Sequence, residues 1–170
     1  MHHVSDALGR SGVNPSSVWF EITESALVAD LDRSADILGD LRRLGVRFAI
    51  DDFGTGYSSL NYLKRFPIDT LKIDKSFVSD VCKDPHDTAI VRAIINLGHA
   101  LDLTVVAEGV ETKEQLQYLS ALECDVVQGF LFSKALSAKA FEELLMEQRR
   151  VTSGNVSPTA PLSVDALLST

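Results

Sequence analysis

Short runs of β-branched and aromatic residues recur along the chain, and polar side chains stand at or near the carboxyl end of each run. Segments with apolar residues at helical spacing separate these runs. Strands that alternate with helices of this length predict parallel βαβ units with right-handed crossovers. We therefore expect strands at residues 18–22, 48–50, 69–74, 103–107 and 125–129, with a short sixth strand at 130–132.

The segments between the strands predict helices. Residues 34–44 carry an apolar stripe that ends at Gly45, and Thr112 and Gln115 stand at the spacing of a capping box. Residues beyond about Val151 lack periodicity and predict a disordered tail. The expected helices are 34–44, 58–64 (beginning at Ser58 or Ser59), 87–101, a segment that opens at 112, and 138–148; the expected domain is 1–148, with a tail at 149–170.

The placement of polar groups after successive strands is typical of a TIM-like (β/α) barrel, whose active site lies at the carboxyl ends of its strands. The expected fold class is α/β. A closed barrel of this type has eight strands and usually at least about 200 residues, whereas this chain has 170 residues. We therefore expect an incomplete barrel that lacks its first strands and keeps about two-thirds to three-quarters of the full set.

Composition narrows the class of protein. A hydrophobic content of 45% in 170 residues suits one globular domain with a sizeable core. No apolar run reaches membrane-spanning length, no signal-peptide core follows Met1, and the widely spaced Cys82 and Cys124 favour a reduced, cytoplasmic chain. A net charge of −8 argues against binding to nucleic acid polymers.

Two adjacent acids, Asp51 and Asp52, follow the apolar run at residues 48–50 and precede a loop with two glycines. Adjacent carboxylates raise each other's pKa unless a counter charge is present, and divalent cations such as Mg²⁺ prefer such oxygen ligands. For an isolated Asp pair, a solvated turn is the alternative. The polar groups near the other strand ends favour a cation site: Glu21, Glu24, Lys72, Glu108, Glu111 and Gln128.

Five segments carry short motifs in a fixed order: Phe20–Ser25, Asp51–Leu60, Leu71–Asp74, Val106–Glu111 and Gln128–Lys134. In order and spacing they resemble the signature segments of the EAL domain family. That family comprises bacterial phosphodiesterases that hydrolyse cyclic di-GMP to the linear dinucleotide. Because several motifs agree at once, the resemblance is specific.

The resemblance implies a centre with two divalent cations, Mg²⁺ or Mn²⁺. Glu21, Asp51 and Asp52 would be metal ligands, with Asp51 suited to bridge two ions. Glu108 would hold the second ion or help to activate water, and Lys72 would orient the attacking water or stabilise phosphate charge. This assignment fits phosphodiester hydrolysis by two metal ions.

The resemblance also implies contacts with substrate and partners. Glu111, as a catalytic residue, and Gln128, as a substrate-binding residue, would complete the site around the metal and cyclic di-GMP. Glu24 would anchor the loop 53–59, which in the family links the metal site to dimer contacts. A homodimer through the loop following Asp52, and an upstream sensory domain or N-terminal EAL segment, are the implied protein partners.

The chain also departs from the family pattern, which the resemblance covers from about residue 5 to residue 147. The Glu-Ala-Leu segment and a metal-binding Asn, on the family's first strands, are absent, and Ala135 stands where the family usually has Pro. We therefore expect weak or no turnover by this chain. Two alternatives stay open: a degenerate EAL module that acts as a cyclic di-GMP receptor or protein-interaction domain without turnover, and another Mg²⁺-dependent barrel enzyme that abstracts a proton next to a carboxylate.

Overall fold

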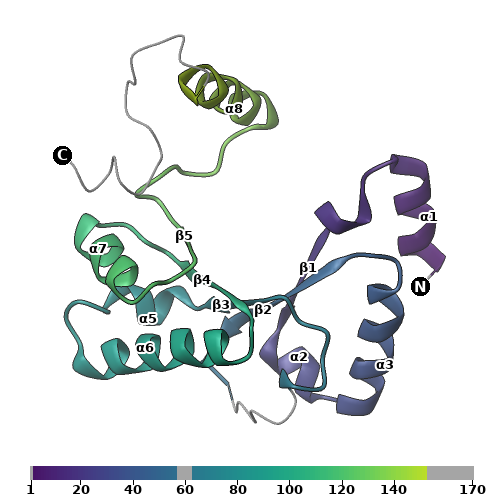
Figure 1. Cartoon of the computed structure of the whole chain (residues 1–170), viewed down its shortest axis with the longest axis horizontal. Helices are drawn as coiled ribbons and strands as arrows, with labels where there is room; N and C mark the ends of the chain where they lie inside the picture. Colours follow the sequence, from purple (N-terminus) through teal and green to yellow (C-terminus); the bar gives the residue numbers. More distant parts are fainter. Residues whose placement is uncertain (1, 57–62, 153–170) are drawn as a thin grey trace.

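The computed structural model describes residues 2–56 and 63–152. At its centre lies one sheet of five parallel strands in the order β1-β2-β3-β4-β5 (Figure 1). The expected parallel α/β architecture and the five expected strands are confirmed, and the sheet is that of an incomplete barrel. The strands are β1 Trp19–Thr23, β2 Arg47–Phe53, β3 Thr70–Ile73, β4 Thr104–Glu108 and β5 Val126–Gln128.

The prediction of a short sixth strand at residues 130–132 is wrong, because this segment forms a turn. The Phe132 N–H donates to the carbonyl of Gly129 at 3.1 Å, and the Leu131 N–H donates to the carbonyl of Val110 at 3.0 Å. The first bond spans three residues, as in a β-turn. The apolar side chains that suggested a strand instead pack, in part, against the core.

The helices between the strands flank the sheet, whereas the last helix, after β5, stands apart from it (Figure 1). The Asp30 side chain caps α3 by accepting a hydrogen bond from the Arg33 N–H, and α7 begins with the expected capping box of Thr112 and Gln115. Two short helices that directly follow β1 and β3 were not predicted. The helices are α1 His2–Ser11, α2 Glu24–Val28, α3 Leu31–Arg42, α5 Lys75–Ser79, α6 Pro85–Ala100, α7 Lys113–Ala121 and α8 Ala138–Thr152, with a 3₁₀ turn at Pro15–Ser17.

Some helix boundaries differ from the expected ones. α3 begins at Leu31 rather than residue 34, because Asp30 supplies the cap. α8 continues to Thr152, past the expected end at residue 148. Residues 58–62 of the helix expected at 58–64, and the tail from residue 153, lie outside the described residues. Among the described helices, none combines the length and apolar character needed to cross a membrane.

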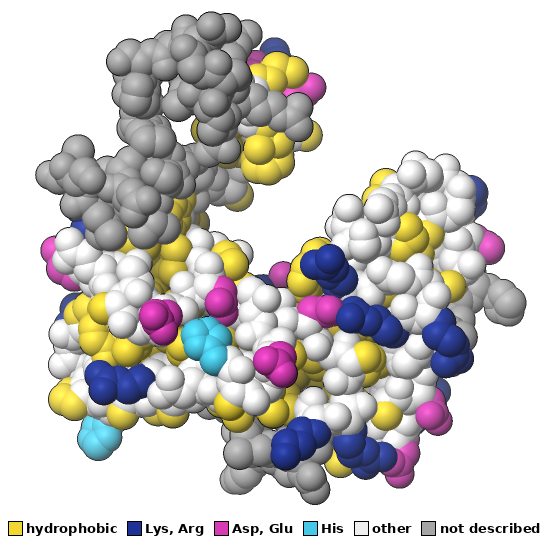
Figure 2. Space-filling view, in the orientation of Figure 1, with side chains coloured by type: hydrophobic (Ala, Val, Ile, Leu, Met, Phe, Trp, Pro, Cys, Tyr) yellow, Lys and Arg dark blue, Asp and Glu magenta, His cyan; other side chains and the backbone are white. Residues whose placement is uncertain are grey.

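The two faces of the sheet differ in character. Register pairs Ile50 with Leu71 and Leu71 with Val105, so these apolar side chains share one face. They are fully buried and belong to one core with apolar side chains of the flanking helices. The opposite face carries polar side chains near the carboxyl ends of the strands, and there Trp19 and Val126 remain 43% and 45% exposed. Figure 2 shows lysine and arginine side chains gathered over α1, β1 and α3 on the face in view.

One arrangement recurs at the amino-terminal edge of the sheet. Asp69, directly before β3, accepts the Phe48 N–H at 2.9 Å and both terminal nitrogens of Arg42 at 2.6 and 2.8 Å. Asp125, directly before β5, accepts the Val105 N–H at 2.7 Å and lies 3.2 Å from Nε2 of His99. Each acid thus joins its own strand to the preceding strand and to the end of a helix. We call these two sets the base clamps.

Replacing Asp69 by asparagine is expected to lower the free energy of unfolding by about 2 kcal/mol, since it removes a bidentate charge-assisted pair. Partial burial would raise the pKa of Asp69, but the hydrogen bonds from Arg42 and the Phe48 N–H outweigh it and hold that pKa below its ordinary value. This stabilisation is therefore present above the ordinary Asp pKa and is lost as pH falls through the depressed folded-state pKa.

Urea unfolding at neutral pH and at decreasing pH measures the effect of Asp69→Asn. Asp32→Asn is the matched control, because its ion pair with Arg65 joins side chains that are 85% and 53% exposed, and such surface pairs contribute about 1 kcal/mol at most. Equal losses in the two variants would contradict the assignment of Asp69 to a clamp.

Candidate functional site

Lys72 lies at the centre of the polar face. Its Nζ is 2.6 Å from Oε1 of Glu108, 2.9 Å from Oε1 of Glu21 and 2.9 Å from Oδ1 of Asp51. The Lys72 side chain is only 8% exposed, because every residue of β3 is buried in the middle of the sheet. Burial would lower the pKa of Lys72, but the hydrogen bonds to Glu108, Glu21 and Asp51 outweigh it and raise that pKa, so the ammonium stays charged.

Strand register explains why these groups converge. Glu21 pairs with Ala49, two residues before Asp51, and Lys72 pairs with Val106, two residues before Glu108. Side chains alternate between the two faces along a strand. Asp51 therefore points to the same face as Glu21, and Glu108 points to the same face as Lys72. The site is therefore a direct product of the in-register parallel sheet.

Asp52 lies in an irregularity of β2. Between Ile50 and Phe53 the register with β3 shifts by one residue, and Asp52 has φ of +53°. A bulge of this kind redirects side chains and is common beside active sites, and Asp tolerates the left-handed conformation better than most residues. Neighbouring side chains of a regular strand point to opposite faces, so the irregularity changes the direction that the Asp52 side chain would otherwise take.

The surroundings of Asp52 disfavour the charged form of its carboxyl group. Desolvation raises the pKa of Asp52, and the charge of Asp51 and a side-chain hydrogen bond with Asp74 raise it further. Burial would also raise the pKa of Asp74, but hydrogen bonds from the hydroxyl and N–H of Ser76 outweigh it and lower that pKa. Asp74 ends the motif Leu71–Asp74 but was assigned no role from the sequence, although its place directly after β3 was the available signal.

A cleft of about 400 Å³ borders Glu108. Gln128 Nε2 donates to Oε1 of Glu108 at 2.9 Å, as expected for residues paired in register across β4 and β5. Glu111 is exposed at the same cleft. Further residues that line the cleft had been given no role in the site from the sequence, among them Lys75, Phe130 and Lys134.

Two glycines let the loops around this cleft approach each other. Gly109 has φ of +74°, and a Cβ there would lie 2.6 Å from Cβ of Lys75. A Cβ on Gly129 would lie 2.1 Å from the carbonyl oxygen of Val110. Substitution of Gly109 would push the loop after β4 away from α5, and substitution of Gly129 would push the end of β5 away from that loop.

Glu24 lies at the start of α2, directly after β1, and its side chain is buried. Its carboxylate packs against Gly56, where a Cβ would come within 3.2 Å of Oε2. This contact is compatible with the expected role of Glu24 in holding the loop 53–59. Residues 57–59 of that loop, with the expected dimer contacts, lie outside the described residues.

The expected metal ligands match a divalent cation in their chemistry but not in their present geometry. Glu21, Asp51, Asp52 and Glu108 supply only carboxylate oxygens, the ligands that Mg²⁺ and Mn²⁺ prefer. Over residues 2–56 and 63–152, no three His, Cys, Asp or Glu side chains come together in a way that could hold a metal ion. Three of the four acids instead converge on the Lys72 ammonium. The donor set fits a hard cation, whereas its present geometry is centred on lysine.

These features define a parallel (β/α) barrel protein with an acidic, lysine-centred site at the carboxyl ends of its strands. A family model described as the EAL domain matches residues 1–135. The chain therefore belongs to the EAL domain family.

Relatives agree with this family. The chain is 47% identical over 146 residues to the cyclic di-GMP phosphodiesterase NbdA of Pseudomonas aeruginosa, covering 86% of this chain and 19% of NbdA. It is 48% identical over 136 residues to the bifunctional diguanylate cyclase/cyclic di-GMP phosphodiesterase MucR of the same species, covering 80% of this chain and 20% of MucR. The chain thus spans about a fifth of the length of these relatives.

Solved structures show the same fold. A PaMucR phosphodiesterase in complex with c-di-GMP matches with a TM-score of 0.79 and 48% identity, covering 81% of this chain and 56% of that one. The EAL domain of Mycobacterium smegmatis DcpA matches with a TM-score of 0.80 and 44% identity, covering 86% and 66%. A manganese and c-di-GMP complex of Klebsiella pneumoniae BlrP1 matches with a TM-score of 0.73 and 39% identity, covering 78% and 34%.

Proposed function

We propose that this chain carries the catalytic edge of a divalent-cation-dependent phosphodiesterase that hydrolyses cyclic di-GMP to the linear dinucleotide. The observation that carries the proposal is the convergence of Lys72 with Glu21, Asp51 and Glu108 at one strand edge. Relatives named for this activity, and solved EAL structures with c-di-GMP, support it. Membership of the EAL family disfavours the alternative of proton abstraction next to a carboxylate.

The residues divide into two groups by their chemistry. Glu21, Asp51, Asp52 and Glu108 would hold Mg²⁺ or Mn²⁺, in the two-ion arrangement that the resemblance implies. Bound there, the cations would supply an activated water and charge neutralisation at the phosphate. A manganese complex of a 39% identical EAL protein supports a divalent cation.

The other residues would contact the substrate or hold in place the groups and loops that form the site. The buried ammonium of Lys72 provides a fixed positive charge for a phosphate oxygen or the attacking water. Gln128 holds the Glu108 carboxylate by its 2.9 Å hydrogen bond and presents its amide to the cleft. Glu111, exposed at the same cleft, would complete the site around the metal and the substrate. Glu24 steadies the loop that begins at Phe53, and a second copy of the chain would dock on that loop.

A receptor without turnover is the second candidate. The observation that favours it is the open polar face: the described sheet has five strands, and Trp19 and Val126 are 43% and 45% exposed on it. Metal-dependent catalysis requires fixed coordination in a shaped cavity, and a displacement of about 1 Å can cost on the order of 100-fold in rate. We accordingly propose that these 170 residues alone turn over cyclic di-GMP slowly or not at all.

Chromatographic detection of the linear dinucleotide, combined with calorimetric binding of cyclic di-GMP, separates the two candidates. Slow Mn²⁺-dependent product formation by the chain, and faster formation when the same residues lie within a complete eight-stranded barrel, would support the phosphodiesterase. Binding without product in both would support the receptor. Absence of binding and product in both would refute both proposals.

Asp51→Asn is expected to abolish cation stabilisation of the fold. At a cation concentration 100 times its Kd, binding to the folded state adds about 2.7 kcal/mol, so the wild-type melting temperature should rise with Mg²⁺ or Mn²⁺. Thermal melts across a cation titration measure this rise. Asp36→Asn, an exposed position on α3, is the control and should respond like the wild type. An unchanged response in Asp51→Asn would remove Asp51 from the metal site.

A further inference from the structure

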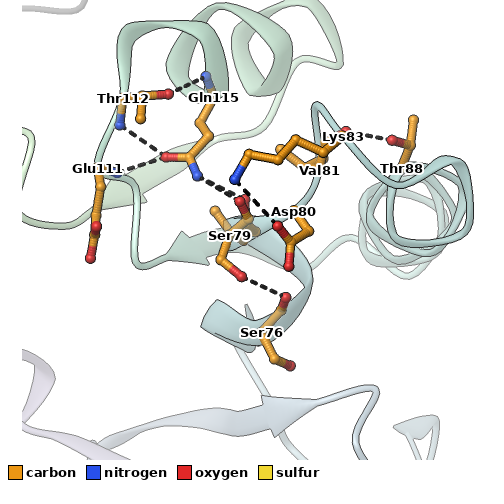
Figure 3. A network of polar contacts seen from close by, with 10 residues as sticks. Ser76, Ser79, Asp80, Val81, Lys83, Thr88, Glu111, Thr112 and Gln115 are labelled. Atoms are coloured by element: carbon orange, nitrogen blue, oxygen red, sulfur yellow. Dashed lines mark hydrogen bonds and ion pairs between the residues drawn. The ribbon is translucent and has the colours of Figure 1, made fainter.

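Both the oxygen and the nitrogen of the Gln115 side-chain amide form hydrogen bonds, although the residue is buried near the start of α7. Its Oε1 accepts the N–H groups of Glu111 and Thr112 at 2.8 and 2.9 Å, and its Nε2 donates to the carbonyls of Val78 and Ser79 at 3.1 and 3.2 Å (Figure 3). Only 6% of the residue is exposed. A buried amide with both ends satisfied holds its partners in a fixed arrangement.

Helix capping accounts for only part of this arrangement. The capping box needs the hydrogen bond from the Thr112 N–H to Gln115 and the return bond from the Gln115 N–H to Oγ1 of Thr112, which is 3.2 Å long. The bonds to Val78 and Ser79 reach 37 and 36 residues back, to the end of α5. Through them Gln115 joins the loop after β4 to the helix that directly follows β3.

This loop is also joined to the end of β5. The Val110 N–H donates to the Gln128 carbonyl at 3.1 Å, and the Leu131 N–H donates to the Val110 carbonyl at 3.0 Å. Val110 is fully buried. One side of the loop 109–112 is thus fastened to α5 by Gln115 and the other side to the turn that follows Gln128.

The three joined elements are the ones that line the cleft beside Glu108. Lys75 comes from α5, Glu111 from the loop 109–112, and Gln128 and Phe130 from the end of β5 and its turn. We propose that Gln115 is a positioning residue that sets the width of this cleft by holding the loop 109–112 against α5. The consequence for ligand binding rests on the proposed function, because cyclic di-GMP is the ligand assigned to the cleft.

Gln115→Glu tests the proposal with little change in shape. A carboxylate keeps the acceptor for Glu111 and Thr112 but replaces the donor with an oxygen that faces the carbonyls of Val78 and Ser79. The loop should therefore separate from α5. Amide hydrogen exchange at Val110 and Leu131 is expected to quicken by roughly tenfold or more, as one lost buried hydrogen bond allows, and cyclic di-GMP binding should weaken by about tenfold.

Two controls isolate the effect. Gln117→Glu makes the same charge change at an exposed position of α7, and Thr112→Val removes the side-chain cap but keeps the Gln115 amide. Both should leave exchange at Leu131 unchanged. If Gln115→Glu fails to fold, Gln115→Asn keeps the chemical groups but shortens their reach, and it should show the same pattern to a smaller degree.

The result separates this inference from the proposed function. Equal Leu131 exchange in Gln115→Glu and Gln117→Glu would overturn the positioning role, whether or not the ligand binds. Unchanged cyclic di-GMP affinity in Gln115→Glu, with a wild type that binds, would also overturn it. A wild type that binds no cyclic di-GMP would refute the proposed function, while the exchange comparison would still decide the role of Gln115.

Discussion

Replacing Lys72 by methionine is expected to lower the free energy of unfolding of the metal-free chain by about 3 kcal/mol or more, the usual cost of leaving buried charges without their partner. Three carboxylates, those of Glu21, Asp51 and Glu108, contact the Lys72 ammonium within 2.9 Å. Methionine preserves the length of the side chain but supplies no charge. The remaining acids would then repel one another.

Urea unfolding without divalent cations measures this loss. Lys83→Met is the matched control, because the Lys83 side chain is 77% exposed and its pairing with Asp80 is 3.4 Å long, so its loss should cost at most about 1 kcal/mol. Adding Mn²⁺ should recover part of the stability of Lys72→Met, since a cation would replace the missing charge. Similar losses in both lysine variants would show that the cluster contributes little to the fold.

In the wild type, the contribution of Lys72 to the free energy of unfolding changes with pH in a definite direction. Because the folded-state pKa of Lys72 is raised, its stabilising contribution is fully present below the ordinary lysine pKa of about 10.4. It is lost only as pH rises through the raised folded-state pKa. The ammonium of Lys72 therefore stays in place throughout the neutral range.

Glu108→Gln is expected to reduce cyclic di-GMP hydrolysis by about 100-fold or more, the scale of effect that misplacement of a catalytic group produces. The substitution keeps the shape of the side chain and an oxygen that can accept from Lys72 and Gln128, but it removes the metal-ligating negative charge. The Lys72 ammonium and the Gln128 amide now contact the same carboxylate oxygen, at 2.6 and 2.9 Å.

Turnover is followed by chromatography of the linear product, in whichever form of the chain shows Mn²⁺-dependent activity. Glu142→Gln, exposed on α8, makes the same chemical change away from the site and should keep the wild-type rate. If Glu108→Gln also kept that rate, Glu108 would have no role in the reaction.

The strand pattern was predictable because runs of β-branched and aromatic residues with a polar group near the carboxyl end are local features of sequence. The carboxyl ends of parallel barrel strands lie at one edge, which explains why Glu21, Lys72 and Glu108 could be expected to lie together before any register was known. The turn at residues 130–132 was mistaken for a strand, since a short apolar run does not distinguish the two. Its structure depends on a hydrogen bond to Val110, twenty-one residues earlier.

The site residues that escaped prediction depend on contacts between distant segments. The redirection of Asp52 arises from a register shift against β3, which no local pattern encodes. Gln115 was recognised only as the partner of Thr112, because its bonds to α5 require a helix of five residues that is too short to show periodicity. The lining of the cleft by Lys75 and Lys134 likewise follows from the packing of α5, the loop 109–112 and the segment after β5.

The base clamps lie at the amino-terminal edge of the sheet, whereas the Lys72 cluster lies at the opposite edge, and none of their hydrogen bonds is shared. Mutations at the two edges should therefore have nearly additive effects on the free energy of unfolding. Evolution or protein engineering could strengthen Asp69 or the His99–Asp125 pair to tolerate destabilising changes among the acids of the site. In this chain, the groups that stabilise the fold against mutation and the groups that carry out the chemistry therefore lie at opposite ends of the same strands.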